Sequence, residues 1–207
     1  MSKFFDQITS ELTQFIRAQK VFFVATAAPE GRINLSPKGM DTFRVLDEKR
    51  VAYLDLTGSG NETAAHLLRD GRITIMFCSF DSNAEIARIY GRGVAIRPDH
   101  ARWPELIANF PKLPGIRQVM EIRVESAMTS CGYAVPRMRE MTPRDTLEKY
   151  WTKKGELGKE EYWQKHNLRS IDGLPTGIQS EVPGRNNLQL KDEDIGGITK
   201  ETRRFSN

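Results

Sequence analysis

The most constraining feature of this sequence is a series of short apolar segments, each bounded by turn-forming residues. They alternate apolar with polar residues or are rich in β-branched and aromatic ones, as strands are. Several connections between them are too short for the helix that joins parallel strands, so a βαβ fold is disfavoured. Alternating strands in a small sheet need one buried face, so the pattern predicts a mainly β fold, a small β-barrel. The six or seven predicted strands come from residues 21–26, 33–36, 43–46, 51–56, 72–78, 86–96 and 116–124.

A few helices are predicted between and after these strands. Asp99 is a candidate N-cap for the helix at 99–110, and Pro111 is its stop. Trp151, Tyr162 and Trp163 are expected to anchor two short charged helices near the C-terminus. The predicted helices span 4–19, 62–68, 99–110, 143–155 and 158–167. We therefore expect a barrel domain at 1–135, a helical C-terminal extension at 136–178 and a polar, flexible tail at 179–207.

The composition excludes several classes of protein. With 39% apolar residues the chain is too apolar for a disordered protein. No apolar run is long enough to span a membrane, and the N-terminus lacks the apolar core of a signal peptide. Cys78 and Cys131 are too few for a disulfide framework or a cysteine zinc site, and the three histidines are far apart. We therefore expect a cytoplasmic protein with no metal site and no membrane partner.

The charge pattern gives no sign of a nucleic-acid partner. The net charge is only +4, from 31 Lys and Arg against 27 Asp and Glu. A nucleic-acid-binding domain usually gathers its basic residues into a patch or stripe, often with aromatic residues between them. No such stripe occurs here, so nucleic acid is not an expected partner.

The segment Gly58-Ser59-Gly60-Asn61-Glu62-Thr63 has the composition of a phosphate-binding turn. Glycines let backbone N–H groups approach a ligand, and Asn61 can cap the helix that follows. A helix N-terminus offers unpaired donors and partial positive charge, which favours an anion. The alternative is an ordinary strand-to-helix turn with no ligand.

Two further segments place cations on predicted strands. Pro37-Lys38-Gly39 ends one strand, and the period of two puts Arg88 and Arg92 on one face of another. Each is also consistent with a solvated turn or an exposed sheet face. Two cationic sites and a helix N-terminus within about sixty residues together fit an anionic phosphate ligand.

Five motifs follow the predicted N-terminal helix in a fixed order. They are Val-Phe-Phe-Val-Ala-Thr (21–26), Asn-Leu-Ser-Pro-Lys-Gly (34–39), Tyr-Leu-Asp-Leu-Thr-Gly-Ser-Gly-Asn-Glu-Thr (53–63), Gly-Arg-Ile-Thr-Ile-Met-Phe (71–77) and Arg-Ile-Tyr-Gly-Arg-Gly (88–93). In this order they resemble the pyridoxamine 5′-phosphate oxidase-like, FMN-binding split-barrel family, over residues 1 to about 135. The resemblance implies a homodimer of small barrels, each binding FMN in a groove at the subunit interface, and an FMN-dependent oxidoreductase acting on a small molecule.

The resemblance also implies which residues contact the cofactor. One group lies on the strand that lines the flavin, a second on the loop and helix start that hold the phosphate, and Arg88 near a flavin-contacting polar residue. By position these are Ser36, Pro37, Lys38 and Gly39 for the strand, and Asn61, Glu62 and Thr63 for the phosphate loop.

Two departures from the family pattern limit what the resemblance implies about the reaction. The oxidases proper have an Arg-Lys pair where this chain has Asn61-Glu62, and a carboxylate beside a phosphate is repulsive. We therefore expect Glu62 to point elsewhere and Lys38 or an arginine to supply the charge. The chain also lacks the C-terminal Arg-Leu-x-Pro motif that helps to bind pyridoxal phosphate, so pyridoxamine 5′-phosphate oxidase activity itself is not expected. The alternative is a non-catalytic flavin-, deazaflavin- or haem-binding protein.

Overall fold

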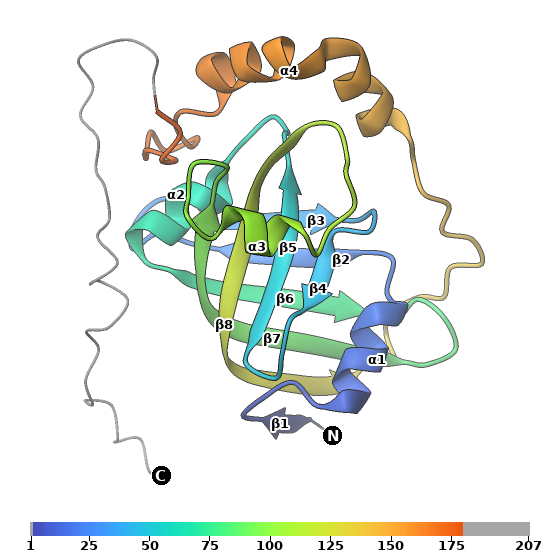
Figure 1. The fold of residues 1–207 in the computed structure, drawn as a ribbon. Helices are drawn as coiled ribbons and strands as arrows, with labels where there is room; N and C mark the ends of the chain where they lie inside the picture. The colour runs from blue at the N-terminus through green and yellow to red at the C-terminus, as the bar shows by residue number, and fades with distance from the viewer. Residues whose placement is uncertain (1, 180–207) are drawn as a thin grey trace.

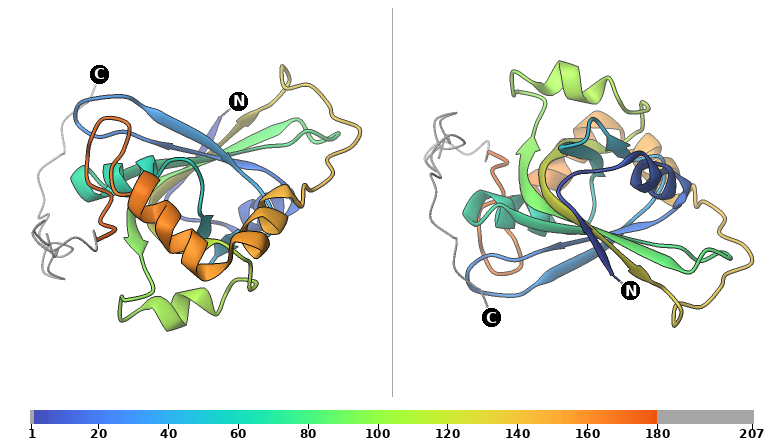
Figure 2. Two further views of the ribbon diagram at one scale, coloured as in Figure 1. Left: turned by 90° about the horizontal axis from the view of Figure 1, so that it is seen from above. Right: turned by 90° about the horizontal axis from the view of Figure 1, so that it is seen from below.

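The computed structural model describes residues 2–179 and consists mainly of one antiparallel sheet (Figure 1). The strand order is β3-β2-β6-β7-β8-β5-β4, and β1 pairs with β8. The sheet curls around an apolar core, and its two end strands, β3 and β4, are not paired with each other in this order (Figures 1 and 2). The predicted split β-barrel is therefore confirmed.

The strands agree with the sequence prediction to within a few residues, except at the N-terminus and at the end of the last strand. All pairings between these strands are antiparallel, as the short connections require. The bounds are β1 Lys3–Phe5, β2 Phe22–Thr26, β3 Asn34–Lys38, β4 Phe43–Val45, β5 Arg50–Leu56, β6 Arg72–Cys78, β7 Glu85–Ile96 and β8 Ile116–Cys131.

Three strands differ from the prediction for identifiable reasons. The expected end of the last strand at Val124 was wrong, because β8 continues to Cys131 and its added residues pair with β7 and β1. The expected end of a strand at Ser36 was wrong, because β3 continues through Pro37 to Lys38. A proline is tolerated there since β3 is an edge strand with β2 as its neighbour. The expected helix at 4–19 was wrong at its start, because residues 3–5 form β1 and pair with β8. Thr9 then caps the helix by accepting a hydrogen bond from the backbone N–H of Leu12, 3.2 Å away.

The helices are α1 Ser10–Ala18, α2 Glu62–Arg69, α3 Trp103–Ile107 and α4 Thr146–His166. The expected helix at 99–110 was too long, and its N-cap is Arg102 rather than Asp99. Pro104 accounts for the late start, because a proline lacks the backbone N–H that positions beyond the first helical turn must donate. The two helices predicted at 143–155 and 158–167 form α4, which has a non-helical residue, Gly155 (φ 66°), within it.

The core has two parts that fix the barrel. Inside the curled sheet, Val24, Ile75 and Ile122 are fully buried. Helix α1 covers one end of this cluster with a stripe of buried residues, Leu12, Phe15 and Ile16. A second cluster lies where α3 packs on the sheet through Leu106. No helix within residues 2–179 has the length and apolar character that crossing a membrane requires.

Glycines inside the alternating strand at 86–96, Gly91 and Gly93, predict a bulge or a close approach of another backbone, and at Gly91 the structure confirms this. The β7–β8 register shifts between Tyr90 and Gly91. A Cβ atom at Gly91 would lie 2.2 Å from the carbonyl oxygen of Arg123, closer than any real contact. The neighbouring strand's backbone therefore requires glycine at this position.

We expect Gly91→Ala to lower the free energy of unfolding by about 3 kcal/mol, because two paired strands must separate to admit the methyl group. Chemical denaturation measures this change. Gly58→Ala is the matched control, since a Cβ there meets no atom within 4 Å. Equal stability of the two variants would contradict the prediction.

Helix α4 lies across the end of the barrel near the loop that follows β5 (Figures 1 and 2). Trp151, which is 3% exposed, donates from Nε1 to the carbonyl oxygen of Thr57 at 2.9 Å. Trp163 donates from Nε1 to the hydroxyl of Thr57 at 2.8 Å. These contacts confirm both tryptophans as anchors of the extension. The tail predicted from 179 onward lies, from residue 180, outside the described residues.

Candidate functional site

A cavity of about 250 Å³ opens where β3, the end of β5 and the start of α2 meet. Strand β3 contributes one wall, and the glycine turn, which we define as Gly58–Gly60, contributes another. The residues that line it are Asn34, Ser36, Lys38, Asp55, Leu56, Gly58, Ser59, Gly60, Asn61, Glu62, Thr63 and Arg117. Segments far apart in the sequence therefore converge on one polar cavity.

A buried ion pair lies in the wall of this cavity. Asp55 on β5 and Arg117 on β8 are 2% and 3% exposed. Arg117 donates from Nε and Nη2 to Asp55 Oδ2, each at 2.9 Å. Burial alone would raise the pKa of Asp55, but Arg117 and Lys38, together with hydrogen bonds, outweigh it and hold the pKa at about 2. Asp55 is therefore a carboxylate at neutral pH, and its charge is compensated within the protein.

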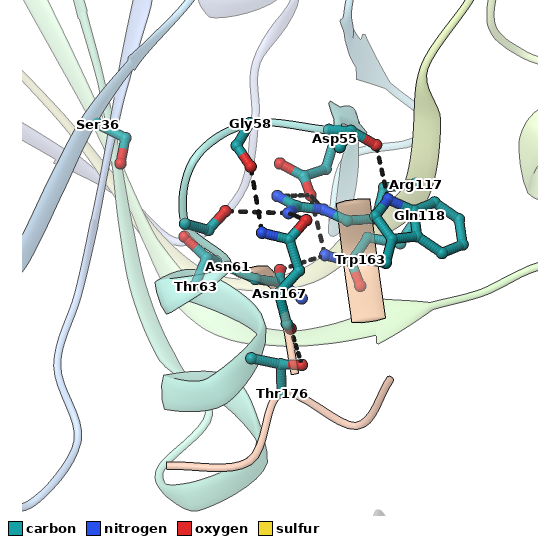
Figure 3. Close-up of polar contacts among 12 residues, drawn as sticks. Ser36, Asp55, Gly58, Asn61, Thr63, Arg117, Gln118, Trp163, Asn167 and Thr176 are labelled. Atoms are coloured by element: carbon teal, nitrogen blue, oxygen red, sulfur yellow. Dashed lines mark hydrogen bonds and ion pairs between the residues drawn. The ribbon is translucent and has the colours of Figure 1, made fainter. Parts of the chain in front are cut away.

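The glycine turn is tied to this ion pair (Figure 3). Arg117 donates from Nη1 to the carbonyl oxygen of Gly60 at 2.9 Å. Asn167, beyond α4, donates from Nδ2 to the carbonyl oxygen of Gly58 at 3.1 Å and accepts from Arg117 Nη1 at 2.9 Å. The turn and the C-terminal extension are thus joined through one buried arginine.

The sequence predicts that Asn61 caps the start of α2, but the structure shows no such cap. Asn61 occupies the N-cap position, but its side chain makes no capping hydrogen bond. Instead its Oδ1 accepts from Gln118 Nε2 at 2.8 Å. Asn61 is 2% exposed, and its Nδ2 has no hydrogen-bond partner within residues 2–179. The first N–H groups of α2 therefore lack a side-chain cap and suit an anion, and the buried amide beside them lacks an acceptor among the described residues.

The β3 wall carries hydroxyl, amide and ammonium groups. Lys38 Nζ lies 3.2 Å from Asp55 Oδ1 and is one-quarter exposed. Asn34 donates from Nδ2 to the hydroxyls of Thr26 and Thr63, at 3.3 and 3.2 Å. Behind them, buried His66 is hydrogen-bonded through Nδ1 to Thr26, 3.1 Å away. Lys38 uses one of its three donors on Asp55, which leaves two for a ligand.

The carboxylate of Glu62 is hydrogen-bonded to the C-terminal extension. This agrees with the expectation that Glu62 points away from a phosphate. The two carboxylate oxygens of Glu62 accept from the backbone N–H of Ile171, at 3.0 and 3.1 Å. Close by, Arg32 forms an ion pair with Asp172. The cavity lining thus contains two cations, Lys38 and Arg117, and two carboxylates, Asp55 and Glu62.

Comparison with known proteins identifies the chain. A family model described as pyridoxamine 5′-phosphate oxidase matches residues 8–131. A pyridoxamine 5′-phosphate oxidase family protein of Aspergillus flavus, ustO, is 35% identical over 202 residues, covering 88% of this chain and 80% of the relative. The chain belongs to the pyridoxamine 5′-phosphate oxidase family.

Solved structures of similar architecture are more distant. HupZ of Group A Streptococcus is 24% identical, with a TM-score of 0.46 over 57% of this chain and 90% of that one. A protein of Lactobacillus delbrueckii described as a putative pyridoxamine 5′-phosphate oxidase is 19% identical, with a TM-score of 0.49 over 59% of this chain and 94% of that one.

The cofactor residues predicted from the family fall into two groups in the structure. Five of them line the cavity together: Ser36, Lys38, Asn61, Glu62 and Thr63. Pro37, Gly39 and Arg88 do not line it. Pro37 is exposed on the other face of β3, Gly39 follows that strand, and Arg88 on β7 donates from Nη1 to the hydroxyl of Ser130 at 3.2 Å. Their assignment as cofactor contacts stays a prediction.

The family motifs did not indicate several residues that form the site. Most of the buried hydrogen bonds around the glycine turn are made by Asp55, Arg117, Gln118 and Asn167. One feature of the sequence could have indicated Arg117 and Gln118. They are adjacent polar residues at the start of an apolar strand. A buried arginine needs an anionic partner, but sequence alone does not say which.

Proposed function

We propose that this chain is an FMN-binding oxidoreductase that acts on a small molecule. The observation that carries the proposal is the uncapped start of α2, where the glycine turn and Asn61, whose buried Nδ2 has no partner among the described residues, line the same cavity as Lys38. Family membership supplies the class of cofactor, and this cavity supplies donors suited to its phosphate.

The residues present fit the phosphate end of FMN. Backbone N–H groups of the α2 start, the hydroxyls of Ser36 and Ser59 and the remaining donors of Lys38 would hold the phosphate oxygens. A ligand would also satisfy Asn61 Nδ2, which otherwise is buried at a cost. The lining has as many positive as negative side chains, so its net charge is zero. The neutral donors, which are the backbone N–H groups and the hydroxyls, would therefore contribute much of the binding.

When bound, the flavin supplies the chemistry by accepting or donating a hydride or electrons. The protein's part is to hold the phosphate, fix the orientation of the ring and exclude water from it. No acid–base side chain is required for hydride transfer to or from the flavin, so the lack of an evident catalytic pair in the motifs agrees with this function.

We propose further that the protein is a homodimer with the cofactor at the subunit interface. A row of side chains crosses the outer face of six strands, because each residue is the cross-strand partner of the next. The row is Pro37, Phe23, Met76, Arg88, Met128 and Phe4. It is apolar except for Arg88, and Phe4 is 70% exposed. If this face packed against a second copy of the chain, Pro37 and Arg88 would lie at the subunit interface.

The absorbance spectrum of the purified protein tests the cofactor. We expect yellow protein that releases FMN on denaturation and rebinds added FMN, and a particle mass of two chains. Colourless protein that takes up no FMN would contradict the proposal. Rapid bleaching of bound flavin by NAD(P)H without oxygen would support an oxidoreductase, whereas flavin that no reductant bleaches would favour the non-catalytic carrier.

We also propose a cytoplasmic location, because Cys131 is an exposed free thiol. Thiols of this kind persist in reducing compartments. Fractionation of cells that express the tagged full chain tests this location.

We expect Glu62→Gln to tighten binding of FMN about five-fold. The change removes a negative charge from the cavity lining, while the glutamine oxygen can still accept from Ile171 N–H, so the fold is preserved. Fluorescence titration of FMN measures the affinity. Glu105→Gln, on the exposed side of α3, serves as the control for loss of one charge. Unchanged or weaker binding by Glu62→Gln would contradict the prediction and show that the Glu62 carboxylate does not repel the phosphate.

A further inference from the structure

The C-terminal extension makes its deepest contact with the glycine turn through one side chain. Asn167 is fully buried. It is held by Thr176, whose hydroxyl donates to the Asn167 carbonyl oxygen at 2.6 Å, and by its own N–H, which donates to Trp163 at 2.9 Å. Its amide then bridges Gly58 and Arg117 (Figure 3).

The glycine turn has little means of fixing its own conformation. A Cβ at Gly58 would meet no atom within 4 Å, so no other segment packs against that side of the residue. Glycine also loses more backbone freedom on ordering than any other residue. The turn therefore depends on bonds from other elements to keep one conformation.

Those bonds determine where the N–H groups of the turn point. In a trans peptide the C=O of one residue and the N–H of the next point in opposite directions. Asn167 binds the carbonyl oxygen of Gly58, and Arg117 binds that of Gly60. The N–H groups of Ser59 and Asn61 must therefore point away from these two side chains, in a turn whose residues line the cavity.

We propose that Asn167 is a positioning residue that makes the C-terminal extension part of the ligand site. It holds the glycine turn with the N–H groups of Ser59 and Asn61 oriented for an anion. This inference rests on the proposed function, because the anion it concerns is the phosphate of FMN. Preorganised donors bind more tightly than mobile ones, since no ordering entropy is lost on binding.

Two variants of the full-length chain separate the two bonds of Asn167. Asn167→Ala removes both. Asn167→Asp keeps an acceptor for Arg117 but cannot donate to the carbonyl oxygen of Gly58 when ionised. Asn109→Ala is the matched control, because Asn109 also donates to backbone carbonyl oxygens, those of Glu105 and Leu106. Asn109 follows α3 and is not among the residues that line the cavity.

The first measurement is hydrogen exchange without ligand. We expect faster exchange in both Asn167 variants at Thr57 and Ala65, whose N–H groups donate to Gly115 and Asn61 at the two ends of the turn. Exchange in β6 and β7 should be unchanged, and Asn109→Ala should behave as wild type. The second is affinity for FMN and for inorganic phosphate. We expect a loss of about tenfold in Asn167→Ala, as removal of one or two buried hydrogen bonds gives.

The outcomes distinguish this inference from the proposed function. If the wild-type protein binds FMN and both Asn167 variants keep wild-type exchange at Thr57 and Ala65 and wild-type affinity, the positioning role is overturned and the function stands. If the wild-type protein binds neither FMN nor phosphate, the proposed function and the ligand role of Asn167 both fail. Global unfolding of one variant leaves the other to decide.

Discussion

Replacing Arg117 with methionine is expected to lower the free energy of unfolding at pH 7 by about 3–5 kcal/mol. Methionine fills much of the same volume, so the loss is mainly electrostatic. It leaves the carboxylate of Asp55, which is 2% exposed, with only Lys38 and Gln118 as partners. It also removes the donors to Gly60 and Asn167. A buried charge that loses its partner is among the most destabilising changes in a protein.

The pH dependence of this loss identifies its cause. In the wild-type protein the pKa of Asp55 is lowered from 3.8 to about 2, so its stabilisation is present above about pH 4 and is lost as the pH falls through 2. In Arg117→Met, burial acts with less opposition and moves the pKa of Asp55 upward. Protonation of Asp55 then removes the unpaired buried charge from the variant. The difference in free energy of unfolding from wild type should therefore shrink between pH 7 and pH 4.

Denaturant unfolding at both pH values measures this difference. Arg72→Met is the control, because Arg72 pairs with Asp70 while 63% exposed and should contribute little. A difference for Arg117→Met that stays below 1 kcal/mol, or that grows as the pH falls, would contradict the burial argument.

The strands were predictable because their signals are local. Residues 72–78 were predicted as a strand and form β6 with those bounds. The Gly91 bulge was predictable for the same reason, since a glycine inside an alternating strand indicates close approach of another backbone. Periodicity and turn residues are properties of short windows, and the short connections between strands then decide the antiparallel pairing.

The errors arose where tertiary contacts override a local pattern. Phe5 continues the helical apolar spacing of the segment that follows, yet it lies in β1 and pairs with β8. Pro37 reads as a turn, yet it lies inside β3 because the sheet ends there. Neither the partner of a strand nor its place at an edge is encoded in a window of ten residues.

The same distinction applies to the candidate site. The glycine turn and Lys38 were found because their composition is unusual and their order resembles a family. Asp55 and Arg117 were missed because they are 62 positions apart and meet only in the folded sheet. Asn167 was missed because its role depends on where α4 ends, 109 positions after the glycine it binds.

Lys38 is expected to have the largest effect on cofactor affinity of any side chain in the cavity. It is the cation of the lining that is partly exposed, whereas Arg117 is buried and already donates to Asp55, Gly60 and Asn167. Its ammonium group has donors left after the bond to Asp55. A charge-assisted hydrogen bond to a phosphate is about twice as strong as a neutral one.

We therefore expect Lys38→Met to weaken FMN binding about 30-fold, which corresponds to ~2 kcal/mol. Stability should fall less than in Arg117→Met, because Asp55 keeps its arginine. Fluorescence titration gives the affinity and denaturant unfolding gives the stability. Lys38→Arg should recover most of the affinity, and Lys112→Met, an exposed lysine after α3, should bind as wild type does. Wild-type affinity in Lys38→Met would mean that the phosphate is not held in this cavity, since the partly exposed cation of its lining would then contribute nothing.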